Sequence, residues 1–346
     1  HDRMHFGAKF QDVFGNRWSY RCNLSEGAGM MGMKRDLSSS EGELTKHGGY
    51  LEYSKASNPI ASGATPQVPL LQFPAALHSG GGSRVIPLDT SSQLACAGPA
   101  SSPGLLASFV RVDAGDSLST FANATSQLFY VISGSGVTQF GPHEIPYGTG
   151  DLFTLPSGPE ATHRAASDTV FYWVHDEPML RYLGVLPSAP RFAPTLYPFS
   201  QSRRALEEAA ADPLAAKRSR ISVLLTHDAF PQTLTITHVL WAMLGILPVA
   251  ANQLPHSHKS VALDFIIDCK PGCFTLVSER VDGHGNLIDP VKVPWEAGGA
   301  FITPPGFWHS HHNESGEVAY LMPIQDAGLH THLRTLDIQF HRSNVV

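Results

Sequence analysis

The stretch from Gly298 to Asn313, which reads GGAFITPPGFWHSHHN, constrains the fold more than any other part of the chain. Its two prolines and the glycine after them predict a tight turn that leads directly to His309. A shorter stretch upstream, Pro255 to His258, reads PHSH. On a strand this spacing puts the imidazoles of His256 and His258 on the same face. Three histidines converging from two strands predict a metal site with open coordination positions.

From Ser83 onward the chain has the pattern of an all-β protein. Short apolar runs such as Gln127–Ile132, Asp151–Pro156 and Val261–Ile267 are separated by turns rich in glycine and proline. No alternation of strands with helices appears, which argues against a parallel nucleotide-binding sheet. The one strongly helical composition is the stretch from Ser200 to Arg220, and we expect a connecting helix there.

Two features of the chain resemble the signatures of the cupin superfamily. The pair His256-x-His258 is similar to the core of the first signature. Five residues have the spacing of the second signature: Gly298, Pro304, Gly306, His309 and Asn313. Both spacings recur earlier in the chain, but Phe121, Asn123 and Gln127 stand where the first signature carries two histidines and a glutamate. The only nearby histidine, His163, comes two residues later than a ligand should.

The resemblance implies a bicupin, an all-β chain with two jelly-roll (double-stranded β-helix) barrels of which only the second keeps a metal site. We therefore expect an N-terminal arm over 1–82, a first barrel over 83–198, a connecting helix over 199–220 and a second barrel over 221–346. The arm is expected to pack across a barrel or a neighbouring subunit, and disorder is an equal alternative for its first 50 residues.

A narrower resemblance is to the gentisate, salicylate and 1-hydroxy-2-naphthoate 1,2-dioxygenases. It rests on Leu240-Trp241-Ala242, on His256-Ser257-His258 and on the run from Thr303 to Glu314. These are bicupin, non-haem Fe(II) enzymes of aromatic compound degradation that cleave a ring with O₂. The resemblance implies that His256, His258 and His309 bind Fe(II), that Trp241 lines a ring pocket and that His311 contacts the substrate's hydroxyl. It also implies, more loosely, that Asp326 is a supporting carboxylate of the substrate site.

Two positions differ from that family. It carries an arginine where this chain has Asp264 and a glutamine where this chain has Gly245. Asp264 is in phase with His256 and His258 along an extended strand, so we expect it to face the pocket as a substrate contact, a metal ligand after a bulge, or a strand-end ion pair. A carboxylate does not hold another carboxylate in a dry pocket. The expected substrate is therefore an enolisable aromatic with an amine or hydroxyl donor rather than gentisate or salicylate, and Gly245 is expected to enlarge its pocket.

Alternatives remain at three levels. His311 is a fourth metal ligand, an acid/base group or a substrate contact. The metal is Fe(II), with Mn, Zn or Ni as alternatives, because imidazole suits all of these ions. The chain is an oxidoreductase using O₂ as co-substrate, a metal-dependent hydrolase, lyase or isomerase, or a non-catalytic module that binds a small molecule.

Composition limits the partners. The net charge of the 346 residues is −6 and no basic stripe is present, so no nucleic-acid partner is expected. No apolar run reaches membrane-spanning length and no secretory leader is expected, which favours a cytoplasmic protein. Cys269 and Cys273 flank an expected hairpin turn and are interpreted as free thiols, with a bridge as the alternative. A homodimer or homotetramer is expected from the resemblance.

Overall fold

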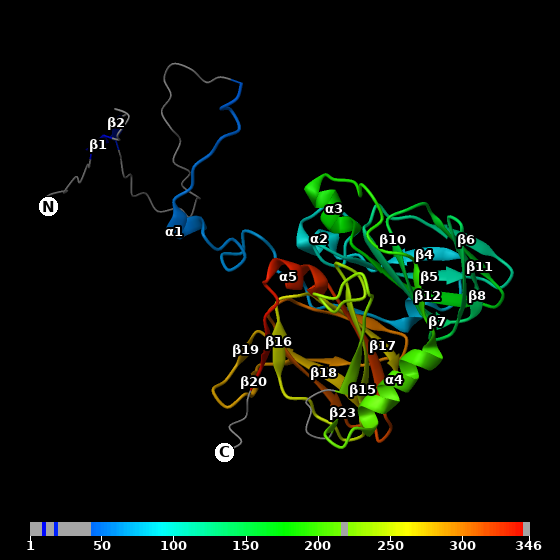
Figure 1. Cartoon of the computed structure of the whole chain (residues 1–346). Coiled ribbons are helices and arrows are strands. Elements are labelled where there is room, and N and C mark those ends of the chain that lie inside the picture. The colour runs from blue at the N-terminus through cyan, green and yellow to red at the C-terminus, as the bar shows by residue number, and fades with distance from the viewer. Residues whose placement is uncertain (1–8, 12–16, 20–42, 216–220, 342–346) are drawn as a thin grey trace. The chain divides into compact units, whose positions relative to one another are not determined.

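The computed structural model describes residues 9–11, 17–19, 43–215 and 221–341. The chain divides into two compact units, His1–Ala64 and Thr65–Val346. In the first unit β1 (Lys9–Gln11) pairs antiparallel with β2 (Arg17–Ser19), and α1 (Tyr53–Ala56) follows. The second unit contains both jelly rolls (Figure 1). The domain boundaries predicted at residues 83, 199 and 221 stay predictions, and Cys22 lies outside the described residues.

The first jelly roll consists of two antiparallel sheets. The larger has the order β13-β10-β7-β12-β5-β4 and the smaller the order β6-β11-β8-β9. The strands of the larger sheet are β4 (Arg84–Pro87), β5 (Leu106–Val112), β7 (Ser126–Ser133), β10 (Leu152–Pro156), β12 (Thr169–His175) and β13 (Thr195–Tyr197). Those of the smaller are β6 (Ser117–Thr120), β8 (Ser135–Phe140), β9 (His143–Gly148) and β11 (Ala161–Ala165). Apolar side chains, including stacked Phe129 and Phe153, fill the space between the sheets.

The second jelly roll repeats this arrangement with the orders β14-β15-β24-β17-β22-β3 and β21-β18-β23-β16-β25. Its larger sheet contains β3 (Gln72–Phe73), β14 (Ile221–Leu225), β15 (Trp241–Leu247), β17 (Ala262–Asp268), β22 (Ala300–Thr303) and β24 (Ala319–Gln325). Its smaller sheet contains β16 (His256–His258), β18 (Cys273–Ser278), β21 (Val291–Pro294), β23 (Trp308–Asn313) and β25 (Ile338–Phe340). A hairpin of β19 (Arg280–Val281) and β20 (Leu287–Ile288) extends from it. The all-β class predicted from the strand rhythm is confirmed, as pairs of sheets rather than closed cylinders.

The two larger sheets pack against each other through one apolar cluster. Tyr172 of β12 stacks on Phe265 of β17 with ring centroids 5.0 Å apart. Leu263 and Phe265 belong to this cluster, whereas Ile266 belongs to the core inside the second jelly roll. Because successive strand residues face opposite sides of a sheet, the odd-numbered positions of β17 face the first jelly roll. The even-numbered positions face the interior of the second.

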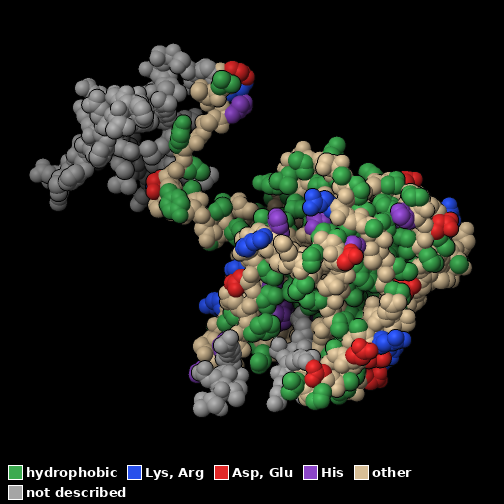
Figure 2. Space-filling model, viewed as in Figure 1, with side chains coloured by type: hydrophobic (Ala, Val, Ile, Leu, Met, Phe, Trp, Pro, Cys, Tyr) green, Lys and Arg blue, Asp and Glu red, His purple; other side chains and the backbone are tan. Residues whose placement is uncertain are grey.

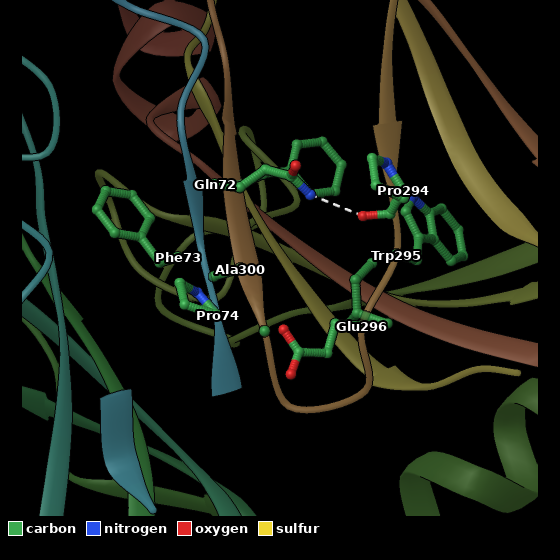
Figure 3. A pocket seen from close by; sticks show the side chains of 10 residues that line it. Gln72, Phe73, Pro74, Pro294, Trp295, Glu296 and Ala300 are labelled. Atoms are coloured by element: carbon green, nitrogen blue, oxygen red, sulfur yellow. Dashed lines mark hydrogen bonds between the residues drawn. The ribbon is translucent and has the colours of Figure 1, made fainter. Parts of the chain in front are cut away.

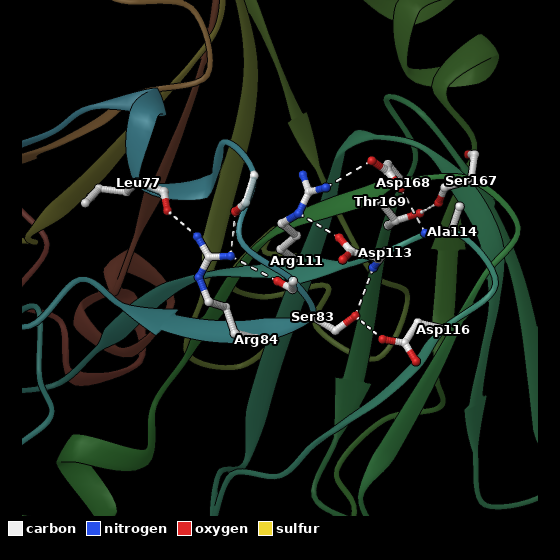
Figure 4. A network of polar contacts seen from close by, with 12 residues as sticks. Leu77, Ser83, Arg84, Arg111, Asp113, Ala114, Asp116, Ser167, Asp168 and Thr169 are labelled. Carbon is white, nitrogen blue, oxygen red and sulfur yellow. Dashed lines mark hydrogen bonds and ion pairs between the residues drawn. The ribbon is translucent and has the colours of Figure 1, made fainter.

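The segment between β3 and β4 connects both jelly rolls. After β3 pairs with β22, the 3₁₀ helix η1 (Ala75–His78) places His78 Nε2 2.9 Å from the Gly298 carbonyl oxygen. Arg84 then donates to the carbonyl oxygens of Leu77, Gly80 and Gly82, while Arg111 pairs with Asp113 and Asp168 (Figure 4). The Arg84 bonds, which are charge-assisted, hold the loop that precedes β4. Ser83 then links the start of β4 to the first jelly roll, because its Oγ accepts from the Asp113 N–H across 3.0 Å.

The helices lie outside the sheets. They are α2 (Ser91–Leu94), α3 (Glu177–Leu183), α4 (Phe199–Ala211) and α5 (Ala327–Leu333). The predicted connecting helix is α4, which is shorter than expected. It ends at Ala211 because Pro213 follows within two residues and cannot continue a helix. Cys269 and Cys273 are free, as interpreted from the sequence.

Candidate metal centre

Three buried histidines of the second jelly roll come together between its two sheets. β16 and β23 are neighbours in the smaller sheet, and His256 lies directly opposite His309 across that pair. One nitrogen from each of His256, His258 and His309 can be chosen so that all lie within 4.8 Å of one another. Nitrogen ligands that share one ion are roughly 3–4 Å apart. Within the described residues, no other such group of histidine, cysteine or carboxylate ligands forms.

Backbone carbonyls fix the tautomers of two of these histidines. His258 Nδ1 lies 2.8 Å from the Ser260 carbonyl oxygen, and His309 Nδ1 lies 3.1 Å from the Phe307 carbonyl oxygen. A carbonyl oxygen only accepts hydrogen bonds, so both Nδ1 atoms carry the proton and both Nε2 atoms keep a lone pair. This orientation by a carbonyl is typical of metal-binding histidines. The donor set therefore fits a first-row transition metal.

The Pro-Pro-Gly turn positions the second of these histidine strands. Gly306 has φ +79°, a conformation that side chains other than glycine rarely adopt. Its N–H donates to the His258 carbonyl oxygen across 2.7 Å. This hydrogen bond joins the turn before β23 to the last residue of β16, and it thereby links the two strands that carry the candidate ligands.

His311 faces the same interior but does not join the cluster of three. Its Nδ1 lies 2.7 Å from Thr275 Oγ1, and Trp295 Nε1 donates to the same hydroxyl across 2.8 Å. Trp295 also lines a pocket of about 220 Å³ at the seam between β3, β22 and β21, where Gln72 donates to the Pro294 carbonyl (Figure 3). The Nδ1 of His311 therefore contacts a side-chain hydroxyl, whereas the Nδ1 atoms of His258 and His309 contact backbone carbonyls.

Asp264 and Trp241 lie on the interior face of the opposite sheet. The predicted continuous strand through His258 and Asp264 is wrong, because β16 ends at His258 and β17 begins at Ala262 in the other sheet. Asp264 still faces the interior, since it alternates with the cluster residues Leu263 and Phe265. It is buried, and Thr303 Oγ1 donates to it across 2.7 Å. Trp241 begins β15, and its Nε1 is buried without a hydrogen-bond partner in the described residues.

At Gly245 the structure differs from the expected wider pocket, whereas the expected role of Asp326 stays a prediction. A Cβ on Gly245 would lie 3.0 Å from Ser222 Oγ and 3.2 Å from Leu321 Cδ2, so neighbouring side chains occupy the space that was expected to enlarge the pocket. Asp326 lies at the start of α5 and accepts from the Val261 N–H across 2.9 Å. Burial raises the pKa of Asp326 to about 7.

In the first jelly roll, the described residues form no group of metal ligands. His163 is fully buried, with Nε2 and Nδ1 each 2.9 Å from the hydroxyls of Thr120 and Thr138. Burial lowers its pKa to about 3, so the ring is neutral. Phe121 is exposed, and Gln127 is buried.

Sequence reasoning missed several residues that support the histidines. Ser260 Oγ lies 3.2 Å from His258 Nδ1 and donates to Gln325 Oε1 across 2.8 Å. The contact of Thr275 with His311 and that of Phe340 with His256 were also not predicted. Ser260 lies two residues after His258, and this nearness in sequence was an available signal. The contacts of Ser260 with Gln325, of Thr275 with His311 and of Phe340 with His256 join distant parts of the chain.

No protein-family model matches the sequence. Gentisate 1,2 dioxygenase 1 from Aquipseudomonas alcaligenes is 28% identical over 123 residues, which are 36% of this chain and 32% of that protein. The match thus spans about a third of the relative's length. In the described part of the chain no helix combines the length and apolarity needed to cross a membrane.

Solved structures resemble the chain over most of its length. Salicylate 1,2-dioxygenase from Pseudaminobacter salicylatoxidans superposes with a TM-score of 0.65 at 13% identity, covering 86% of this chain and 95% of that one. A mutant of that enzyme in complex with gentisate gives a TM-score of 0.64 at 13% identity, covering 84% and 91%. At such identities the likeness establishes the fold.

Proposed function

We propose that this chain, which has the bicupin fold of salicylate 1,2-dioxygenase, is a mononuclear, non-haem Fe(II) dioxygenase that cleaves a carbon–carbon bond of a hydroxylated aromatic or similar chelating molecule. The single observation that carries the proposal is the buried cluster of His256, His258 and His309. A site of three neutral imidazoles with no carboxylate leaves several coordination positions for other ligands. Fe(II), when bound there, would supply adjacent positions for a chelating substrate and O₂.

The chain's own residues would prepare the substrate. His311, held through Nδ1 by Thr275, would orient the substrate's hydroxyl or receive its proton. The buried indole N–H of Trp241 is a donor that a substrate oxygen could satisfy. Both groups come from strands rather than loops, which keeps them in place.

Asp264 points to the substrate class. Its carboxyl is buried on the sheet face opposite the histidines. A substrate carboxylate beside it would meet a like charge in a desolvated site, which is strongly unfavourable. We therefore propose a substrate with an amine or hydroxyl donor, such as an aminophenol or a catechol, in preference to gentisate or salicylate.

The experiment begins with protein purified without oxygen and loaded with Fe(II). Metal content is measured first, and oxygen uptake is then recorded over aminophenols, catechols and hydroxylated aromatic acids. Stoichiometric iron and uptake that disappears in His256→Ala, but not in a variant of the exposed His143 of β9, His143→Ala, would support the proposal. Tight binding of zinc, manganese or nickel without oxygen uptake would favour a hydrolase, lyase or isomerase instead. Protein that binds no metal would leave a non-catalytic binding module.

On the face seen in Figure 2, Lys and Arg side chains lie scattered among Asp and Glu, without a basic stripe. We propose that the protein binds neither nucleic acid nor membranes and that it works in the cytoplasm. We also propose that it forms a homodimer or homotetramer. Sedimentation of the full chain would test the last of these directly.

A further inference from the structure

We propose that the C-terminal strand β25 positions the metal centre, with Phe340 as a positioning residue for His256. The inference depends on the three-histidine metal site of the proposed function, but not on the dioxygenase chemistry. It assigns a role to a segment that follows the last helix and contributes no metal ligand.

β16 is held mainly by β25. On its other side, β23 contributes one residue pair, His256 opposite His309. β25 contributes three pairs, placing Phe340, Gln339 and Ile338 opposite residues 256, 257 and 258. A strand of only three residues carries two of the three candidate ligands, so its backbone depends on this ladder.

The register of the ladder brings Phe340 onto His256. The His341 N–H donates to the Pro255 carbonyl oxygen across 3.0 Å, so that pair is of the hydrogen-bonded type. Antiparallel pairs alternate in type, which makes the next pair, His256 with Phe340, the type whose side chains lie closest. The two rings stack accordingly, with centroids 5.8 Å apart and planes 20° from parallel. Phe340 therefore restricts the orientation of a candidate ligand.

β25 itself has little else to hold it. It is the last strand in its sheet, and in the described residues no strand pairs with its other edge. Gln339 and Phe340 are exposed, the latter by 53%. A strand with so few buried contacts opens easily. An ion bound by His256 and His258 orders β16, so metal binding and the docking of β25 should favour each other reciprocally.

Three variants and the unaltered chain test this inference. Phe340→Ala removes the ring and keeps the ladder, Gln339→Ala is the matched control on the opposite face, and a stop after Asp337 removes the strand. The dissociation constant for Fe(II) is measured anaerobically by competition with a chromogenic chelator. We expect it to rise about tenfold or more without the strand and several-fold in Phe340→Ala, as for other residues that orient metal ligands. In Gln339→Ala it should stay within twofold.

Hydrogen exchange on the full chain gives a second readout that does not depend on a variant folding. Chelation of the metal should speed exchange at the Gln339 and His341 amides, which face β16, by about tenfold or more. Dissociation constants within twofold of the unaltered chain in Phe340→Ala, together with unchanged exchange, would overturn the inference. If the unaltered chain bound no metal, the proposed metal centre would fail as well. Metal binding without oxygen uptake would contradict only the dioxygenase proposal.

Discussion

His258 Nδ1 donates to the carbonyl oxygen of Ser260 across 2.8 Å, two residues further along the chain. The Ser260 hydroxyl extends this contact to Gln325 on the opposite sheet. The bond leaves Nε2 as the only nitrogen of His258 with a lone pair. Orientation of this candidate ligand is therefore set by backbone that sits between the two sheets.

Replacing Ser260 by alanine should weaken metal binding without abolishing it. The carbonyl that fixes the tautomer stays, but the hydroxyl link to Gln325 is lost, so we expect the dissociation constant for Fe(II) to rise up to about tenfold. Ser310→Ala is the control, because Ser310 is a buried serine of β23 whose hydroxyl contacts His312, not one of the three clustered histidines. Equal affinities in the two variants would contradict the assigned role of Ser260.

Thr275→Val should affect His311 rather than the metal. The substitution removes the hydroxyl that contacts His311 Nδ1 and leaves Trp295 Nε1 buried without its acceptor. An unsatisfied buried donor costs about 1–3 kcal/mol of folding free energy. We expect this loss in the free energy of unfolding measured with denaturant, a kcat at least tenfold lower and an unchanged metal affinity. Thr275→Ser should restore the unfolding free energy and kcat. A failure to do so would show that packing, not the hydroxyl, matters.

Asp264→Asn should change substrate preference. Asparagine keeps an oxygen that can accept from Thr303 Oγ1 but carries no charge. With the like charge removed, kcat/KM for a hydroxylated aromatic acid should rise about tenfold relative to that for an aminophenol. Steady-state kinetics on both substrates measure the ratio. A ratio unchanged by the substitution would place Asp264 outside the substrate site.

His163→Ala should destabilise the first jelly roll and leave the metal content unchanged. The ring fills a buried site and satisfies the hydroxyls of Thr120 and Thr138. Its loss leaves a cavity and two buried polar groups, for which we expect about 3 kcal/mol lower unfolding free energy. Metal analysis should still give one ion per chain. A fall in metal content with the folded structure intact would contradict this and show that His163 takes part in metal binding.

Asp326 should make the folded chain less stable as the pH rises from about 4 to 7. Its pKa is raised from 3.8 to about 7 by burial, so in this range the folded state keeps a proton that the unfolded state has released. The free energy of unfolding then falls with increasing pH, by up to about 1.4 kcal/mol per pH unit. Asp326→Asn should lack this pH-dependent contribution. Asp289→Asn is the control, because the carboxyl of Asp289 is exposed, and this variant should keep the contribution. Parallel profiles for all three proteins would refute the assignment.

The sequence by itself determined the strand class and which three histidines come together. The Pro-Pro-Gly turn before His309 and the two-residue spacing of His256 and His258 are local features, and local spacing fixes which side chains share a strand face. The same reasoning indicated that the first jelly roll lacks ligands, since the positions of Phe121 and Asn123 carry none.

Only the tertiary structure decided what surrounds that site. Asp264 reaches the interior from the opposite sheet, because the chain leaves one sheet after His258 and enters the other at Ala262. The space beside Gly245 is filled by Leu321, and Phe340 stacks on His256 from the far end of the chain. These contacts join segments that are distant in sequence. Strand order and register set them, and neither is encoded in the period of a single segment.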